Sequence, residues 1–368
     1  MTLIQRTTKT AFDTNRRIER LIQERDAMLA VKWAAMLAKH PERTQVLRGH
    51  RMVGGPFGRW FRLDDTAFSA DDKALLRQYN GDGGLAKHGA RGVGLLQEFY
   101  TPVEIARACV ALARRYGWEG GRVLEPSCGP GNFLAALPEG EVDAHELNPV
   151  SARVAQILYP NAEVRAGEFE CLFVDQKRNR SLKDKLEGLP RYSLVIGNPP
   201  FGKYFGRCAN MGERQYVGAP SLDTYFLSRS LDLLEPTGLL VFILPASFLQ
   251  NGQKLNRIKQ KIALKAALLD AYRLWNSALY HTEELTDICV FQRRPVQHPE
   301  VPLSQWMNDA FLQQQPQKVL GSFTGNGGAW GRAEYSGDIR LLARIPAFAA
   351  ETAREALRAR ILARTSSQ

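Results

Sequence analysis

The 368-residue sequence has few cysteines, and it lacks both a long apolar run and a secretory leader. Its five cysteines are scattered, odd in number and free of any CxxC pair, which argues against a disulfide framework or a zinc site and predicts reduced thiols. The longest apolar run, Leu239–Leu244, is far too short to span a bilayer, and no signal-peptide core opens the chain. These absences predict a cytoplasmic protein that binds no metal and no membrane.

Positive charge gathers at the N-terminal end of the chain. Residues 1–62 hold 13 Lys and Arg against 5 Asp and Glu, so they carry most of the net charge of +11. Such asymmetry predicts a polyanionic partner, most simply nucleic acid, although a solvated face would look the same. A long helix is predicted over residues 11–40, and Arg16, Arg17 and Arg20 are its candidate nucleic-acid contacts. The Gly-rich, Arg-containing segment that follows could contact a phosphate backbone or pack irregularly.

A Gly-rich turn follows a predicted strand at residues 122–124. Glu125 ends this strand, and Gly129 and Gly131 lie in the turn, which leads into a helix predicted to begin near Asn132. The glycines would let the backbone approach a ligand. The third glycine of the dinucleotide-binding GxGxxG pattern is absent. A carboxylate here favours a cationic amino group over a pyrophosphate.

Two further acidic residues follow predicted strands. Glu146 ends the strand at residues 142–148, where a carboxylate can accept hydrogen bonds from both hydroxyls of a ribose; an ordinary strand-end carboxylate is the alternative. Glu168 and Phe169 follow the strand at residues 162–166. Upstream, Thr101 is predicted to cap a helix over residues 103–116 that has Pro102 as its first residue.

The most informative stretch is Asn198-Pro-Pro-Phe201, directly after the apolar strand Leu194–Ile196. Two prolines prevent both a further ladder hydrogen bond and a helical turn, which leaves an extended elbow at the carboxyl end of the strand. The Asn198 side chain and the Pro199 carbonyl are two acceptors, and Phe201 offers an aromatic face. This combination suits an exocyclic amino group on a flat ring. Taken alone, the stretch could also be a strand-ending turn.

Together, these motifs resemble those of the gamma-class S-adenosylmethionine-dependent adenine-N6 DNA methyltransferases, over about residues 95–295. The resemblance implies an α/β fold with a Rossmann-like sheet, mostly parallel with a terminal antiparallel strand, and helices on both faces. It implies S-adenosylmethionine as cofactor and a flipped adenine as target. The family more often has Asp where Glu168 stands. The residues implied in catalysis are Asn198, Pro199, Pro200 and Phe201. Those implied in cofactor binding are Tyr100, Thr101, Pro102, Glu125, Cys128, Gly129, Gly131, Asn132, Phe133, Glu146, Leu147, Glu168 and Phe169.

More narrowly, residues 94–102 and the strand beginning at Thr286 resemble the methylase part of phage and plasmid methylase–helicase proteins. The implied organisation is a basic, helical and Gly-rich DNA-binding extension (1–95), a catalytic domain (96–295) and a small C-terminal segment (296–368) for possible DNA recognition. Lys203, Arg207 and Arg214, in the loop after Phe201, are further candidate contacts to double-stranded DNA. A restriction endonuclease, if there is one, would be a separate chain. The alternatives are methylation of RNA or of a protein glutamine, and a non-catalytic DNA-binding or anti-restriction protein.

Overall fold

The structure, a computed structural model, describes residues 13–29, 31, 67–81, 98–203, 206–250, 255–280, 282, 284–295, 303, 306, 308–327, 332–351 and 353. Most of the Gly-rich segment, residues 32–40 of the predicted N-terminal helix and residues 354–368 therefore lie outside the described residues. Within the described part of the chain, no helix is both long enough and apolar enough to cross a membrane.

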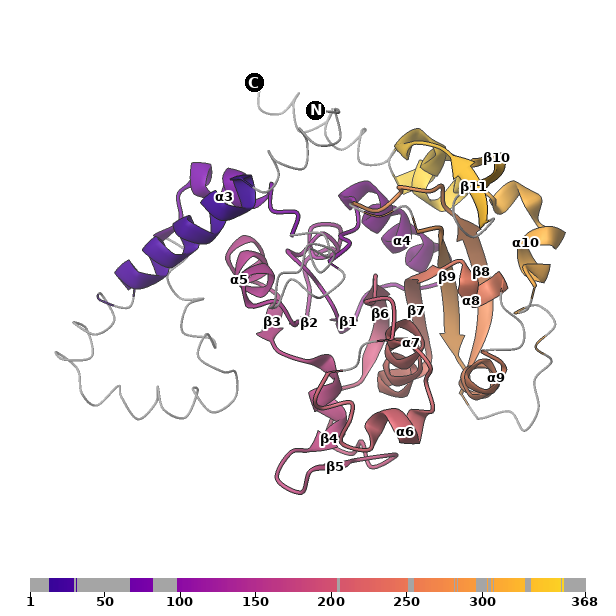
Figure 1. The fold of residues 1–368 in the computed structure, drawn as a ribbon, viewed down its shortest axis with the longest axis horizontal. Coiled ribbons are helices and arrows are strands. Elements are labelled where there is room, and N and C mark those ends of the chain that lie inside the picture. The colour runs from indigo at the N-terminus through magenta and orange to yellow at the C-terminus, as the bar shows by residue number, and fades with distance from the viewer. Residues whose placement is uncertain are drawn as a thin grey trace.

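A seven-stranded sheet with the order β3-β2-β1-β6-β7-β9-β8 organises the described residues (Figure 1). Its strands are β1 (Val123–Glu125), β2 (Val142–Glu146), β3 (Glu163–Ala166), β6 (Tyr192–Gly197), β7 (Leu234–Pro245), β8 (Ala266–Arg273) and β9 (Thr286–Arg293). The pairs from β3 to β7 are parallel, and β9 runs antiparallel to both of its neighbours. The predicted antiparallel strand is thus confirmed; it is last in sequence but lies between β7 and β8.

Helices cover both faces of this sheet (Figure 1). On one face, α4 (Val103–Arg115) and α5 (Pro149–Leu158) pack in a core that contains Leu194 and Ile196 of β6. On the other, α7 (Leu222–Leu233) and α9 (Asn256–Lys265) pack in a core that contains Val195. Successive side chains of a strand point to opposite faces, so a strand buried on both sides is apolar throughout. This explains the unbroken apolar run Leu194–Ile196.

The order of the strands reverses between β1 and β6. After β1 the chain builds β2 and β3 outward on one side, then returns to pair β6 with the other side of β1, with Val123 opposite Leu194. Ligands of open α/β sheets bind at the carboxyl ends of the strands beside such a reversal. Glu125 and Asn198 both lie at this edge.

Two local predictions are wrong. Residues 130–136 form turns instead of a helix, because Gly131 has a left-handed backbone (φ 97°) and Pro138 follows too soon for a helix to propagate. Helix α4 begins at Val103 with Pro102 at the N-cap, so Thr101 lies one residue too early to cap it.

The N-terminal helical residues 13–29 pack onto the sheet domain. With α3 (Ala70–Leu76) they contribute Ile18, Ile22 and Leu76 to a cluster that includes residues of α5. Arg153 of α5 also forms an ion pair with Asp26. Arg16, Arg17 and Arg20 remain exposed on this helix. The N-terminal extension is therefore anchored by its apolar face.

The remaining elements surround this core. They are η5 (Phe169–Phe173), β4 (Val174–Asp175), β5 (Arg180–Ser181), α6 (Glu213–Val217), α8 (Ser247–Gln250), α10 (Ala310–Gln314), η7 (Pro316–Lys318), β10 (Ser322–Gly327), β11 (Arg332–Ser336) and η8 (Ile339–Arg344). Arg273 of β8 forms ion pairs with Asp287 and with Asp309, which connects the start of the C-terminal segment to the sheet.

Candidate active site

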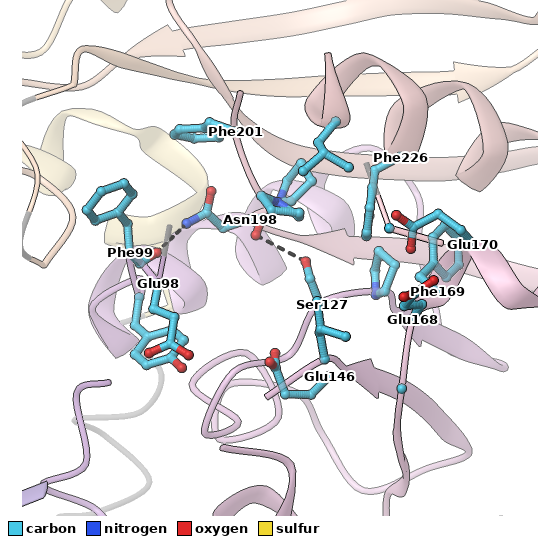
Figure 2. A pocket seen from close by; sticks show the side chains of 18 residues that line it. Glu98, Phe99, Ser127, Glu146, Glu168, Phe169, Glu170, Asn198, Phe201 and Phe226 are labelled. Atoms are coloured by element: carbon cyan, nitrogen blue, oxygen red, sulfur yellow. Dashed lines mark hydrogen bonds between the residues drawn. The ribbon is translucent and has the colours of Figure 1, made fainter. Parts of the chain in front are cut away.

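A pocket opens at the carboxyl ends of β1, β2, β3 and β6, and 18 residues line it (Figure 2). A smaller hollow adjoins it through Phe99, Tyr100, Ser127 and Asn198, which line both. The predicted residues that line the larger pocket are Tyr100, Glu146, Leu147, Glu168, Phe169, Asn198, Pro199, Pro200 and Phe201. Those that line the smaller hollow are Tyr100, Thr101, Glu125, Cys128, Asn132, Phe133 and Asn198. Motifs up to a hundred residues apart in sequence therefore meet in one place.

Asn198 is held in one orientation. Its Nδ2 donates to the Phe99 carbonyl at 2.9 Å, and the hydroxyl of Ser127 donates to the Asn198 backbone carbonyl at 3.1 Å (Figure 2). Because the Phe99 carbonyl can only accept, the side-chain Oδ1 is directed away from it. That Oδ1 is buried and has no hydrogen-bond partner among the described residues. A buried acceptor without a partner costs folding free energy, so it marks a place where a donor of a ligand can bind.

Two further unpartnered polar atoms lie in the smaller hollow. Glu125 is only 1% exposed, and its Oε2, like the Thr101 hydroxyl, has no partner among the described residues. Burial, and then the neighbouring Glu146, raise the pKa of Glu125 well above its usual value. A bound cation would offset both causes. Glu125 is therefore suited to receive a positively charged group.

Glu146 is tied to the backbone around it. Its two carboxylate oxygens accept from the amides of Gly129, at 2.8 Å, and of Asn148, at 2.7 Å. Burial nevertheless raises the pKa of Glu146 to about 7. Each oxygen of an ionised carboxylate keeps acceptor capacity after one such bond. Glu146 can therefore still accept hydrogen bonds from a ligand.

The two glycines of the turn are required by the protein's own aromatic rings. Gly129 and Gly131 have φ of 55° and 97°, and an added Cβ would lie 2.6 Å from the Tyr100 ring and 2.5 Å from the Tyr159 ring, respectively. Glycine is thus required for packing at both positions, while the expectation that the turn lets a ligand approach stays a prediction. Tyr100 lines the pocket and packs against this turn, and its hydroxyl lies 2.6 Å from that of Ser151.

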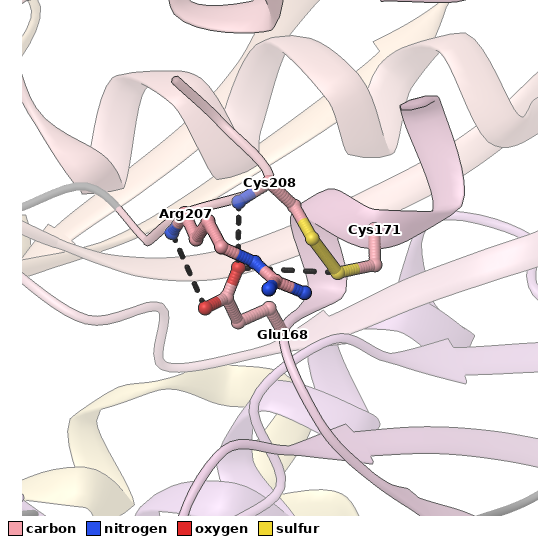
Figure 3. The surroundings of a disulfide bond; sticks show 4 residues. All are labelled: Glu168, Cys171, Arg207 and Cys208. Atoms are coloured by element: carbon pink, nitrogen blue, oxygen red, sulfur yellow. Dashed lines mark hydrogen bonds between the residues drawn. A yellow bond between two sulfur atoms is a disulfide. The ribbon is translucent and has the colours of Figure 1, made fainter. Parts of the chain in front are cut away.

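Glu168 contacts the loop after Phe201. Its carboxylate accepts from the backbone amides of Arg207, at 3.2 Å, and Cys208, at 2.9 Å (Figure 3). Beside it, Cys171 and Cys208 form a disulfide. The prediction of reduced thiols is wrong for these two, because the loop folds back onto η5 and brings together residues 37 positions apart. Cys109, Cys128 and Cys289 are free and buried.

The same three residues, Glu168, Cys171 and Cys208, form the one group of potential metal ligands found in the described part of the chain, with ligand atoms within 4.8 Å of one another. With both sulfurs joined, this group offers no thiolate to a metal. That the protein binds no metal stays a prediction.

Sequence reasoning did not single out nine of the residues that line the pocket, among them Glu98, Glu170 and Phe226. Glu98 is buried and accepts from the Asn148 side chain. Burial raises the pKa of Glu170 to about 7. Phe226 lies 4.9 Å from Phe169, centroid to centroid, and extends that aromatic wall. Glu98 and Glu170 lie next to predicted site residues in the sequence, Tyr100 and Phe169, and could have been found for that reason. Nothing in the sequence marked Phe226.

The candidate nucleic-acid contacts are exposed and fall on two separate elements. Lys203, Arg207 and Arg214 lie between β6 and α7, and Arg16, Arg17 and Arg20 lie on the helix of residues 13–29. None of these side chains lines the pocket. Pro102 is buried at the start of α4 and does not line it either. DNA binding by the six basic residues stays a prediction.

Part of the chain is similar to a known family of proteins. Residues 157–278, which include Glu168 and Asn198-Pro-Pro-Phe201, match the family model of the Eco57I restriction-modification methylase. About a third of the chain is therefore similar to the Eco57I restriction-modification methylases. The matched residues run from the end of α5 into the β8–β9 connection and so include the carboxyl end of β6.

Relatives of the chain include restriction and anti-restriction proteins. The chain is 29% identical over 246 residues to the defense against restriction protein B of Escherichia phage P1, which covers 66% of this chain and 10% of that protein. It is 29% identical over 173 residues to the type II methyltransferase M.TthHB8I of Thermus thermophilus, covering 40% of this chain and 34% of that protein. The chain thus spans about a tenth and a third of the lengths of these two relatives.

Among solved structures, the type I restriction-modification methyltransferase subunit of Streptococcus thermophilus aligns with a TM-score of 0.44 and 19% identity, covering 60% of this chain and 49% of that one. At this level of similarity the alignment adds nothing to the sheet order described above.

Proposed function

We propose that this protein transfers a methyl group from S-adenosylmethionine to the N6 amino group of adenine in double-stranded DNA. The observation that carries the proposal is the buried, unpartnered Oδ1 of Asn198, fixed in orientation by the Phe99 carbonyl at the carboxyl end of β6. The similarity to restriction-modification methylases supports DNA as the substrate class.

The residues present fit the cofactor. S-adenosylmethionine, when bound, supplies an electrophilic methyl group on a positively charged sulfur. In our proposal, the unpartnered Oε2 of Glu125 receives the cationic amino group, and the remaining acceptor capacity of Glu146 takes the ribose hydroxyls. Leu147 and the buried ring of Phe169 provide walls for the adenine ring. Glu168 is the candidate acceptor for the cofactor's adenine amino group, in addition to the loop amides that it already binds.

Asn198 and Pro199 would activate the target. The amino nitrogen of adenine is a poor nucleophile because its lone pair is delocalised into the ring. Two acceptors, Asn198 Oδ1 and the Pro199 carbonyl, would take both amino hydrogens and localise that lone pair toward the methyl group. No strong base is needed, because the nitrogen-bound proton becomes acidic once the C–N bond forms. The remaining contribution is proximity and orientation.

Phe201 would hold the target base outside the helix. The amino group of a stacked adenine cannot reach a pocket, so the nucleotide must flip out of the duplex. The partly exposed ring of Phe201 lines the pocket next to Asn198 and offers a stacking surface (Figure 2). Stacking of a base on an aromatic side chain contributes about 1–3 kcal/mol.

A second candidate function is protection of DNA against restriction without catalysis, which the similarity to the phage P1 protein favours. The two functions are separable by Asn198→Ala. If protection depends on methyl transfer, the variant loses both methyl transfer and protection. If protection needs only DNA binding, the variant still protects DNA.

The test is to express the chain alone in bacteria that lack adenine methylation and to sequence their DNA with a method that detects N6-methyladenine. The proposal predicts methylated adenines at a short recurrent sequence with the wild type and none with Asn198→Ala. Methyl groups found only in RNA or on protein glutamine would overturn the choice of substrate.

A further inference from the structure

The Cys171–Cys208 disulfide joins two segments that border the pocket (Figure 3). Cys171 lies in η5, whose first residue, Phe169, lines the pocket. Cys208 lies two residues after Gly206, which lines the pocket from the opposite segment. The covalent bond therefore connects the aromatic wall to the loop that follows the Asn-Pro-Pro-Phe stretch.

Glu168 sits directly between these two segments. Both of its carboxylate oxygens are engaged by the amides of Arg207 and Cys208, and an added Cβ at Gly206 would lie 2.7 Å from its carboxylate. The loop backbone is thus packed against the carboxylate with no room to spare. Cys208 itself is only 1% exposed.

The same contact extends to Glu170. Its pKa is raised mainly by burial, while a hydrogen bond from the Gly206 amide lowers it in part. Two successive backbone amides, those of Arg207 and Cys208, are therefore held by the Glu168 carboxylate, next to Glu170. The disulfide fixes one end of this short segment.

We propose that the Cys171–Cys208 disulfide is a redox-responsive latch that sets the affinity of the pocket for its cofactor; this inference rests on the proposed function. A dithiol reductant opens the latch: it gives two electrons and two protons, the S–S bond breaks into two thiols, and the reductant becomes a disulfide. In the open state only hydrogen bonds hold residues 206–208 against Glu168. Binding must then also order this segment, which weakens affinity, on the order of three- to tenfold.

The experiment measures S-adenosylmethionine binding by calorimetry with the full chain, before and after treatment with dithiothreitol. Thiol titration of the denatured protein, with three free cysteines expected before reduction and all five after it, verifies the state of the latch. We expect the dissociation constant to rise three- to tenfold on reduction. The double variant Cys171→Ser/Cys208→Ser should show the weaker affinity in both conditions. Cys109→Ala, which removes a buried thiol in the core on the α4 face, should retain the response.

Three results would contradict the proposed latch. Equal affinity of the wild type before and after reduction overturns the latch, and this comparison needs no variant to fold. Tight zinc binding by the reduced wild type, lost in the double variant, would overturn it in favour of a metal site at Glu168, Cys171 and Cys208. Absence of binding in both states would contradict the proposed function itself, and the latch with it.

Discussion

Replacing Asn198 by alanine should abolish methyl transfer while it leaves cofactor binding nearly intact. The side chain has two separable roles. The Nδ2–Phe99 bond, at 2.9 Å, contributes about 1 kcal/mol to folding, as partly buried neutral hydrogen bonds do. The unpartnered Oδ1 makes no hydrogen bond in the ligand-free protein, so its loss slows methyl transfer only through the missing bond to the target amino group. Removal of one preorganised group of this kind costs about 2.7–4 kcal/mol in the transition state, or a rate loss of about 10²–10³.

The assay is single-turnover transfer of labelled methyl to duplex DNA, with calorimetry for S-adenosylmethionine affinity. A matched control is Asn276→Ala. Asn276 also makes a side-chain bond to a backbone group, accepting from the Tyr335 amide at 2.7 Å, but it does not line the pocket. It should lose a similar amount of stability and keep its rate. If Asn198→Ala retains more than about a tenth of the wild-type rate, the acceptor role assigned to Asn198 is wrong.

Three further predictions concern other parts of the protein. Glu146→Ala should weaken cofactor binding by about 1–3 kcal/mol through the loss of hydrogen bonds. The affinity of the wild type for the cofactor should rise between pH 6 and 8, because the pKa of Glu146 is about 7 and its ionised form is the better acceptor. If calorimetry across this pH range shows neither effect, Glu146 has only a structural role. Replacing the three exposed arginines of helix 13–29 by alanine should flatten the slope of log DNA affinity against log salt concentration. The expected change is about 0.9 for each DNA phosphate that the variant no longer neutralises, and the methylated sequence should stay the same. An unchanged slope would show that this helix packs against the sheet domain without contacting DNA. Gly129→Ala should lower the free energy of unfolding by at least about 1 kcal/mol, since the residue has a positive φ and an added Cβ would overlap an aromatic ring. Chemical denaturation measures this change. The control is Gly140→Ala, because no atom lies within 4 Å of its added Cβ.

Local patterns were sufficient to predict most of the sheet. The apolar run Leu194–Ile196 and the longer one in β7 are buried on both faces, so composition alone marks them as central strands. Acids and turn residues at strand ends then placed Glu125, Glu146 and Asn198 at one edge, where the structure finds them. These features depend on short stretches of sequence and on the general topology of parallel sheets.

What escaped prediction depends on contacts between distant segments. The partner of Cys171 is set by how a loop 37 residues later folds back, which no spacing rule conveys. The reason for glycine at position 129 is a ring from Tyr100, on a segment outside the turn. The predicted helix after Asn132 is missing because the left-handed Gly131 precedes it and Pro138 follows too soon for a helix to propagate.

The sequence also did not show how the N-terminal extension packs. Its arginines predicted a polyanion-binding arm, yet Ile18 and Ile22 on the same helix are buried against α3 and α5. One helix can do both, because a packed apolar face leaves the opposite face exposed. Deleting the whole arm would uncover that cluster, so substitution of the exposed arginines is the cleaner test of their charge.

The most direct test of the central claim is a mass measurement on DNA. Purified full-length protein is incubated with duplex DNA and S-adenosylmethionine that carries a deuterated methyl group, and the DNA is then digested to nucleosides. Our account predicts deuterated N6-methyladenine with the wild type and a signal at least about a hundredfold lower with Asn198→Ala. Label found on cytosine instead, or no label in DNA from a protein that binds the cofactor, would contradict it.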